Sequence, residues 1–313
     1  MKDFSAAHGM YPVMLTPFTE SGEIDWSVYD RLIDWYIEKG VTGIFAVCGS
    51  SEYFKLTEEE ALRLASVAVK RSAGRVHVLA GSNFHRTIEA NIALTRRMAE
   101  TGVEGCFITT PPPDVVPPED NAMVDYYFAI HDAADVPLYA YEQPVTPYKF
   151  SYDAIAKIGA GKRFIGMKDT SVGDVSIEEG VAHMKRKMQA AGDQFRILTA
   201  GSEYILPFLQ AGVAGGMTIA ANVAPGLFAE LWRRFRANDM AAAQVLFERV
   251  TKVDEMIGYG YMKSAKIALG MIGLPIKPVT RVPSREFDAN RLAALRDLVR
   301  LIEETEAEFG IGR

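Results

Sequence analysis

The sequence predicts an α/β protein, a (β/α)₈ TIM barrel with a C-terminal helical extension. Three observations predict this fold: eight short apolar segments, a helical segment after each of them, and a length of 313 residues. Strand and helix units repeated in this way are typical of parallel sheets, and roughly 250 residues are typical of one barrel. An open doubly wound sheet is the main alternative, but no Gly-x-Gly-x-x-Gly motif follows the first strand.

The eight apolar segments lack a strict alternation of polar and apolar residues. This pattern is typical of strands that are buried on both faces of a parallel sheet. The expected strands are residues 13–15, 43–47, 76–80, 106–109, 137–141, 164–167, 196–199 and 216–220.

The intervening segments have apolar residues at helical spacing. Thr57 and Glu60 predict a capping box at the start of one helix, and Pro225 suits a first helical turn because its missing N–H is not needed there. The expected helices are residues 25–36, a segment that begins at 57, then 86–100, 119–134, 151–158, 173–190, 203–211 and 225–236.

Three further helices are expected after the eighth unit, at residues 239–257, 261–272 and 288–308, with prolines before the last of them. No flexible linker precedes these segments. We therefore expect a barrel over residues 1–237 and a helical extension over residues 238–313 that packs on it.

The composition limits the class of protein. Hydrophobic residues make up 49% and charged residues 24% of the chain, which is typical of soluble globular proteins. The net charge of −6 argues against a nucleic-acid partner. The sequence has no run of 18 apolar residues and no apolar N-terminal leader, and its two cysteines show no Cys-x-x-Cys spacing. We expect a cytoplasmic protein with no membrane partner.

Lys168 is the first candidate for chemistry, since it ends the sixth expected strand. The active site of such a barrel lies at the C-terminal ends of its strands. Burying an ammonium group costs several kcal/mol. Lys168 is therefore either a surface residue, a partner of Asp169 in a salt bridge, or an amine with a lowered pKa that attacks a carbonyl.

Two neighbouring features join Lys168. Tyr141 ends the fifth expected strand, where it either passes a proton to a bound substrate or packs as a simple aromatic residue. The turn after the second strand offers backbone N–H groups and the hydroxyls of Ser50 and Ser51 to an anion. The same turn also fits an ordinary loop or a helix cap.

Other chemistries find less support in the sequence. The five histidines lack the paired spacing of a zinc site, and neither a Gly-x-Ser-x-Gly elbow nor a P-loop occurs. Cys48 is near the expected site, but no base can be assigned to it. We expect no metal and no cofactor.

The order of four motifs resembles the dihydrodipicolinate synthase / N-acetylneuraminate lyase superfamily. These motifs are Gly-Ser-Ser-Glu at 49–52, Tyr-x-x-Pro at 141–144, Gly-x-Lys-Asp at 166–169 and Ala-Asn-Val-Ala-Pro at 221–225. The resemblance covers nearly the whole chain. It implies a cofactor-free class I aldolase that acts on a small 2-oxo acid and assembles as a homotetramer.

The resemblance also implies roles for single residues. Lys168 matches the Schiff-base lysine and Tyr141 the proton-relaying tyrosine. Gly49 and Ser50 align with the pair that holds the substrate carboxylate, and Ser51 stands beside them in a turn whose glycine and hydroxyl have changed places. Met217 falls where the family has an apolar residue against the substrate.

Two departures from the pattern bear on the substrate. Thr146 stands where dihydrodipicolinate synthases carry an arginine, with Lys149 as the nearest cation, and prolines 111–113 replace a loop tyrosine. These departures favour an aldolase, lyase or dehydratase acting on pyruvate or a 2-oxo-3-deoxy sugar acid. A 4-hydroxy-tetrahydrodipicolinate synthase and a non-catalytic 2-oxo acid binding protein are the alternatives.

Overall fold

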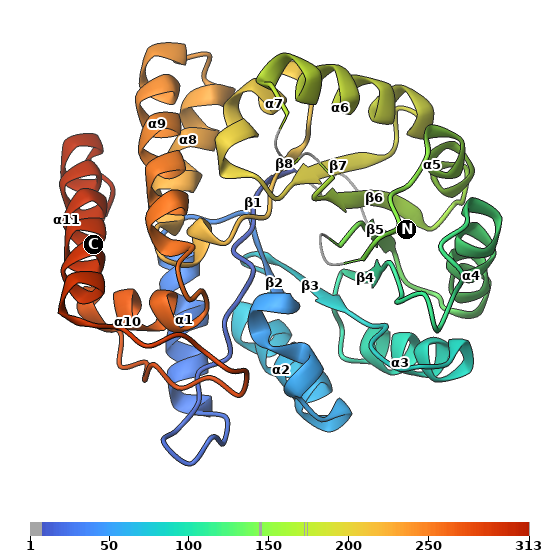
Figure 1. Cartoon of the computed structure of the whole chain (residues 1–313), viewed down its shortest axis with the longest axis horizontal. Helices are drawn as coiled ribbons and strands as arrows, with labels where there is room; N and C mark the ends of the chain where they lie inside the picture. The colour runs from blue at the N-terminus through green and yellow to red at the C-terminus, as the bar shows by residue number, and fades with distance from the viewer. Residues whose placement is uncertain (1–7, 144–145, 172, 174, 313) are drawn as a thin grey trace.

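The computed structural model describes residues 8–143, 146–171, 173 and 175–312. Its eight parallel strands follow the order β1-β8-β7-β6-β5-β4-β3-β2, and Figure 1 shows the helices arranged around them. This nearly closed barrel confirms the predicted fold class. The strands are β1 (Gly9–Met10), β2 (Gly43–Val47), β3 (His77–Gly81), β4 (Gly105–Thr109), β5 (Leu138–Tyr141), β6 (Phe164–Asp169), β7 (Arg196–Thr199) and β8 (Gly215–Gly216).

The first strand lies earlier than residues 13–15, where the sequence placed it. β1 pairs with β8, and Pro12 follows it; a proline has no N–H to continue a ladder. The gap to β2 is closed by single hydrogen bonds: the Phe45 N–H donates to the Pro12 carbonyl at 3.0 Å, and Val13 forms an isolated bridge with Phe45. The predicted strand is therefore present only as this bridge.

The eighth strand is shorter than the predicted 216–220. It approaches β1 so closely that a Cβ atom on Gly215 would lie 1.9 Å from the carbonyl oxygen of Gly9, so only glycine fits there. Beyond Gly216 the chain leaves the sheet and forms a 3₁₀ turn at Ala220–Asn222.

The helices of the barrel follow the predicted segments closely. The capping box of Thr57 and Glu60 is confirmed, and Pro225 opens α8 as expected. The sixth helix begins at Ile177 because Ser176 and Glu179 form its capping box; of the predicted segment 173–190, residue 174 lies outside the described residues. The helices are α1 (Trp26–Glu38), α2 (Glu58–Ser72), α3 (Ile88–Glu100), α4 (Asp120–Ala133), α5 (Tyr152–Gly159), α6 (Ile177–Ala191), α7 (Ile205–Ala211) and α8 (Pro225–Arg236).

Three helices extend the chain beyond the barrel: α9 (Met240–Ile257), α10 (Lys263–Ile272) and α11 (Ala289–Phe309). α9 packs between α8 and α11, at one side of the barrel (Figure 1). The tenth helix begins two residues after its predicted start, because Met262 has a φ of +51° that ends the preceding turn. Tyr261 is consequently a turn residue. The domain boundary at residue 237 stays a prediction.

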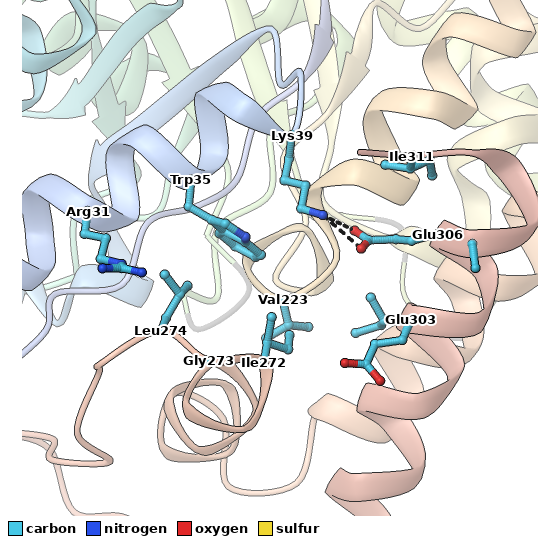
Figure 2. Close-up of a pocket in the computed structure, with 12 residues that line it drawn as sticks. Arg31, Trp35, Lys39, Val223, Ile272, Gly273, Leu274, Glu303, Glu306 and Ile311 are labelled. Carbon is cyan, nitrogen blue, oxygen red and sulfur yellow. Dashed lines mark hydrogen bonds and ion pairs between the residues drawn. The ribbon is translucent and has the colours of Figure 1, made fainter. Parts of the chain in front are cut away.

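Ion pairs fasten the extension to the barrel. The ammonium of Lys39, at the end of α1, donates to both carboxylate oxygens of Glu306 on α11 at 2.8 and 2.9 Å, and to the carbonyl of Gly312 at 2.8 Å. This pair lies at the edge of a groove between α1 and α11 (Figure 2). Of the charged residues that line the groove, Lys39 and Glu306 are the least exposed, and they are paired with each other.

Aromatic side chains fill the barrel interior. Phe107 stacks on Phe45 with ring centroids 4.4 Å apart and on Tyr139 with centroids 4.9 Å apart. These rings belong to an inner cluster that also contains Leu198 and Met217. Since the interior is packed, a substrate site has room only at the end of the barrel.

Candidate active site

Lys168 lies at the end of β6 and is 6% exposed. Its ammonium nitrogen is 4.7 Å from the ring centroid of Tyr141 and 5.8 Å from that of Phe45, and it has no hydrogen-bond or ion-pair partner among the described residues. Burial lowers the pKa of Lys168 to about 8. Both alternative interpretations are excluded, since the side chain is buried and Asp169 binds another cation.

Tyr141 is the direct neighbour of Lys168 in the β5–β6 ladder. It is buried, and burial raises the pKa of its phenol, which therefore keeps its proton at neutral pH. In the part of the chain that the structure describes, no group accepts or donates a hydrogen bond at this hydroxyl. The structure thus brings an unpaired phenol and an unpaired amine together at one mouth of the barrel.

The turn after β2 is a 3₁₀ helix at Gly49–Ser51, and its two serines have different surroundings. The Ser51 hydroxyl accepts from the N–H of Cys48 at 3.0 Å and lies 2.8 Å and 2.9 Å from the carbonyl oxygens of Met14 and Ala46. Its one proton is engaged by main chain. Ser51 therefore supports the turn, and the hydroxyl available to a ligand is that of Ser50.

Gly49 faces open space, since a Cβ atom built on it would meet nothing within 4 Å. It lines a small cavity at the barrel mouth. The cavity is lined by Phe45, Val47, Cys48, Gly49, Tyr53, Gly81, Asn83, Phe84, Thr109 and Tyr141. The adjacent Ser50 hydroxyl accepts a hydrogen bond of 2.9 Å from the Tyr261 hydroxyl. Met217 is buried in the inner cluster that also holds Tyr141.

Cys48 lines the same cavity. Burial raises the pKa of its thiol, so that it stays protonated at neutral pH. Its sulfur lies 3.4 Å from the Ser51 hydroxyl oxygen. A protonated thiol is a poor nucleophile, so Cys48 is a weaker candidate for chemistry than Lys168. Within the described residues, no group of three or more His, Cys, Asp or Glu side chains is placed to hold a metal ion.

A buried ionic cluster behind the site is a feature that sequence reasoning missed. Lys187 on α6 donates to Glu142 at 2.6 Å, to Ser171 at 2.9 Å and to Asp169. The two carboxylates raise the pKa of Lys187 against the opposing effect of burial. The available signal was an acidic residue directly after Tyr141 and another directly after Lys168.

A second buried ion pair holds the Gly49–Ser51 turn. Glu52 has a φ of +60°, and its carboxylate accepts from the ammonium of Lys266 at 2.9 Å and from the N–H groups of Arg281 and Val282 at 2.7 and 2.9 Å. Lys266 belongs to α10. The C-terminal extension therefore anchors the turn, which the sequence did not indicate.

Thr146 stands at the position where dihydrodipicolinate synthases carry an arginine, and its neighbour there is another hydroxyl residue. The Thr146 hydroxyl lies 2.7 Å from that of Thr110. The Lys149 ammonium donates to the carbonyl of Gln143 at 2.7 Å. Pro144, part of the Tyr-x-x-Pro motif, lies outside the described residues. Thr146 carries no charge, and the ammonium of Lys149 is bound to a main-chain carbonyl.

A family model described as the dihydrodipicolinate synthetase family matches residues 6–302. The chain belongs to this family. A 4-hydroxy-tetrahydrodipicolinate synthase from Ruegeria pomeroyi is 31% identical, over 92% of this chain and 96% of the relative. One from Acidiphilium cryptum is 28% identical, over 90% and 96%. The predicted family is confirmed, and the chain is an enzyme of the class I aldolase type of lyase rather than a non-catalytic binding protein.

Solved structures agree with the fold. A dihydrodipicolinate synthase from Bacillus anthracis superposes with a TM-score of 0.85 at 24% identity, covering 96% of this chain and 99% of that chain. The synthase from Acinetobacter baumannii, solved with pyruvate, gives 0.85 at 23% identity, covering 95% and 99%. A prophage protein of the family from E. coli K12, also solved with pyruvate, gives 0.84 at 23% identity, covering 95% and 98%.

Proposed function

We propose that this enzyme forms a Schiff base between Lys168 and the C2 carbonyl of a 2-oxo acid such as pyruvate. The observation that carries the proposal is the state of Lys168, a buried amine with a lowered pKa and no partner among the described residues. A neutral amine is the form that attacks a carbonyl. The pyruvate complexes of two structural relatives support the same class of substrate.

The proposed reaction begins when the Lys168 amine adds to C2. The Tyr141 phenol gives its proton to the hydroxyl of this adduct, water leaves, and a cationic imine remains. In the cleavage direction the Tyr141 phenolate takes the proton of the C4 hydroxyl, and the electron pair of the C3–C4 bond moves toward the imine. An aldehyde leaves and an enamine remains on Lys168. Protonation at C3 and hydrolysis then release pyruvate and restore the amine.

The cavity lining bears on the second reactant. None of its lining side chains carries a formal charge at neutral pH, and Thr146 and Lys149 are engaged by hydroxyl and carbonyl groups. A carboxylate on the far side of the substrate would find no arginine fork there. We therefore propose a 2-oxo-3-deoxy sugar acid, or pyruvate with an uncharged aldehyde, as the substrate.

The names of the sequence relatives favour a second candidate, 4-hydroxy-tetrahydrodipicolinate synthase activity. A coupled synthase assay beside retro-aldol and dehydration assays on 2-oxo-3-deoxy sugar acids separates the two. We expect aspartate semialdehyde to give a lower kcat/KM, on the order of 30-fold or more, because its carboxylate lacks a charged partner. The highest kcat/KM for the semialdehyde would overturn the sugar-acid proposal and make Lys149→Met the next variant.

Borohydride reduction in the presence of pyruvate tests the Schiff base itself. Mass spectrometry of the digested protein should find the reduced adduct on the peptide that contains Lys168, and Lys168→Arg should abolish it. An adduct on another lysine, or none at all, would overturn the proposal. Turnover should also survive prolonged treatment with a strong chelator, since this chemistry needs no metal.

We also propose a cytoplasmic homotetramer, as the family resemblance implies. No helix among the described residues is long and apolar enough to cross a bilayer. Light scattering at working concentration measures the assembly, and a clean monomer would contradict the tetramer.

A further inference from the structure

A chain of hydrogen bonds leads from the outer wall of the barrel to Ser50. The Tyr36 hydroxyl on α1 donates to the Asn222 side-chain oxygen at 2.7 Å. The Asn222 amide nitrogen donates to the Tyr261 hydroxyl at 2.7 Å, and that hydroxyl donates to Ser50 at 2.9 Å. All four side chains are buried or nearly so. The chain joins α1, the 3₁₀ turn after β8, the C-terminal extension and the substrate turn.

The carbonyl oxygen of Val13 fixes the direction of this chain. It lies 2.7 Å from the Asn222 amide nitrogen, and a carbonyl only accepts hydrogen bonds. The amide nitrogen of Asn222 must therefore face Val13, which leaves its oxygen for Tyr36. The Tyr261 oxygen in turn accepts from the amide, so its single proton is directed to Ser50.

This direction determines what Ser50 offers to a ligand. Its oxygen accepts from Tyr261, so the proton of Ser50 is left over. No described residue accepts that proton. Ser50 stands next to Gly49, whose open side faces the cavity that Tyr141 also lines. Ser51 contrasts with it, because its proton is already engaged by main-chain carbonyls.

The backbone around Tyr261 is a second, independent observation. Gly260 has a φ of +60°, and Met262 has a φ of +51° with a ψ of −40°, a combination that residues other than glycine rarely adopt. Strained backbone such as that of Met262 is concentrated at functional sites. The strained residue directly follows Tyr261, which among the described residues of the extension is the one that hydrogen-bonds to Ser50.

We propose that Tyr261 is a positioning residue: it holds Ser50 as a hydrogen-bond donor to the carboxylate of the 2-oxo acid bound at Lys168. This inference rests on the proposed function and deepens it, since the C-terminal extension then contributes to substrate binding. Tyr261 itself does not touch the reacting atoms.

The test uses pyruvate and borohydride, and measures the pyruvate concentration that gives half-maximal trapping on Lys168. Tyr261→Phe removes only the hydroxyl. We expect this concentration to rise about tenfold, because a hydrogen bond to a charged group is lost or misdirected, while trapping at saturating pyruvate stays close to wild type.

Tyr36→Phe is the matched control. It removes a hydroxyl from the same buried chain, but Val13 still directs Asn222, so the half-saturating concentration should stay within about twofold of wild type even if the melting temperature falls. An equal rise in both variants would overturn the inference, since it would mean general loosening of the structure.

A double-mutant cycle identifies the partner. In a Ser50→Ala background, Tyr261→Phe should have almost no further effect, because the group that it positions is gone. Independent, multiplicative effects would overturn the inference. Should Tyr261→Phe fail to fold, 3-fluorotyrosine at position 261 keeps a stronger donor: half-saturation should then stay at the wild-type value or fall, and a tenfold rise would contradict us.

The same experiment distinguishes a failure of the proposed function from a failure of this inference. If the wild-type enzyme is not trapped on Lys168 by pyruvate, the Schiff-base proposal itself is wrong. If it is trapped and Tyr261→Phe matches wild type, only the role of Tyr261 is wrong.

Discussion

Two buried lysines, Lys168 and Lys187, show how position alone decides chemistry. They are 6% and 0% exposed, so both lose hydration to a similar degree. Lys187 binds Glu142 and Asp169, which raise its pKa, whereas Lys168 has no carboxylate partner among the described residues and its pKa falls to about 8. Of these two lysines, burial therefore lowers the pKa only of the one that no carboxylate accompanies.

The period of the β-strand produces this difference. Consecutive residues of a strand point to opposite faces. Tyr141 and Lys168 therefore face the interior of the barrel, while the residues that follow them, Glu142 and Asp169, face α6 and receive Lys187. One pair of strands thus presents Lys168 and Tyr141 to the barrel interior and a buried ionic cluster to α6.

Replacing Lys168 is expected to have the largest effect on activity. Lys168→Ala and Lys168→Arg should each lower kcat/KM by roughly a thousandfold or more, because neither side chain forms the imine. Steady-state assays with the best substrate measure this, and circular dichroism checks the fold. Turnover within about tenfold of wild type would remove Lys168 from the mechanism.

Replacing Tyr141, which pairs with Lys168 in the β5–β6 ladder, is expected to have the second largest effect on activity. Tyr141→Phe keeps the packing of the ring but removes the proton, so we expect kcat to fall on the order of a hundredfold to ten-thousandfold. Pyruvate should still be trapped on Lys168 by borohydride, only more slowly. If kcat is unchanged, another group moves the proton, and Tyr141 is a packing residue only.

Replacing Lys187 should lower the stability of the fold rather than change the chemistry. Lys187→Met leaves two carboxylates buried without their cation, so we expect a loss of about 3–5 kcal/mol in the free energy of unfolding. Denaturant titration measures it. The triple variant Lys187→Met, Glu142→Gln, Asp169→Asn removes all three charges and should recover much of the loss. If the single and the triple variant are equally unstable, packing rather than charge explains the effect.

The sequence indicated where Lys168 and Tyr141 lie but not where Lys187 lies, for a physical reason. Lys168 and Tyr141 end two apolar strands, and strand ends carry the site in this fold, so a local pattern was sufficient. Lys187 lies in the middle of an amphipathic helix, 45 residues from Glu142. The spacing of residues along a helix does not indicate which lysine will be buried against a carboxylate from another element.

The same limit applies to Tyr261 and to the first strand. Tyr261 reaches Ser50 across 211 positions of sequence, and its place in a turn depends on the unusual backbone of Met262. The first strand was misplaced because Val13, Met14 and Leu15 are apolar, while the pairing depends on Gly9 lying close against Gly215. Apolar runs indicate burial, but long-range contacts decide which residues pair.

The smallest expected effect concerns pH, and it tests the comparison of the two lysines directly. With the pKa of Lys168 near 8, its amine is mostly protonated below that pH and mostly neutral above it. Lys187, with a raised pKa, stays protonated throughout this range. The value of kcat/KM, which reports the free enzyme, should therefore rise about tenfold between pH 7 and pH 9 with an inflection near 8. Melting temperatures over the same range control for unfolding. A flat profile, or a fall through pH 8, would mean that Lys168 does not titrate as an isolated buried amine and has a charged partner in solution.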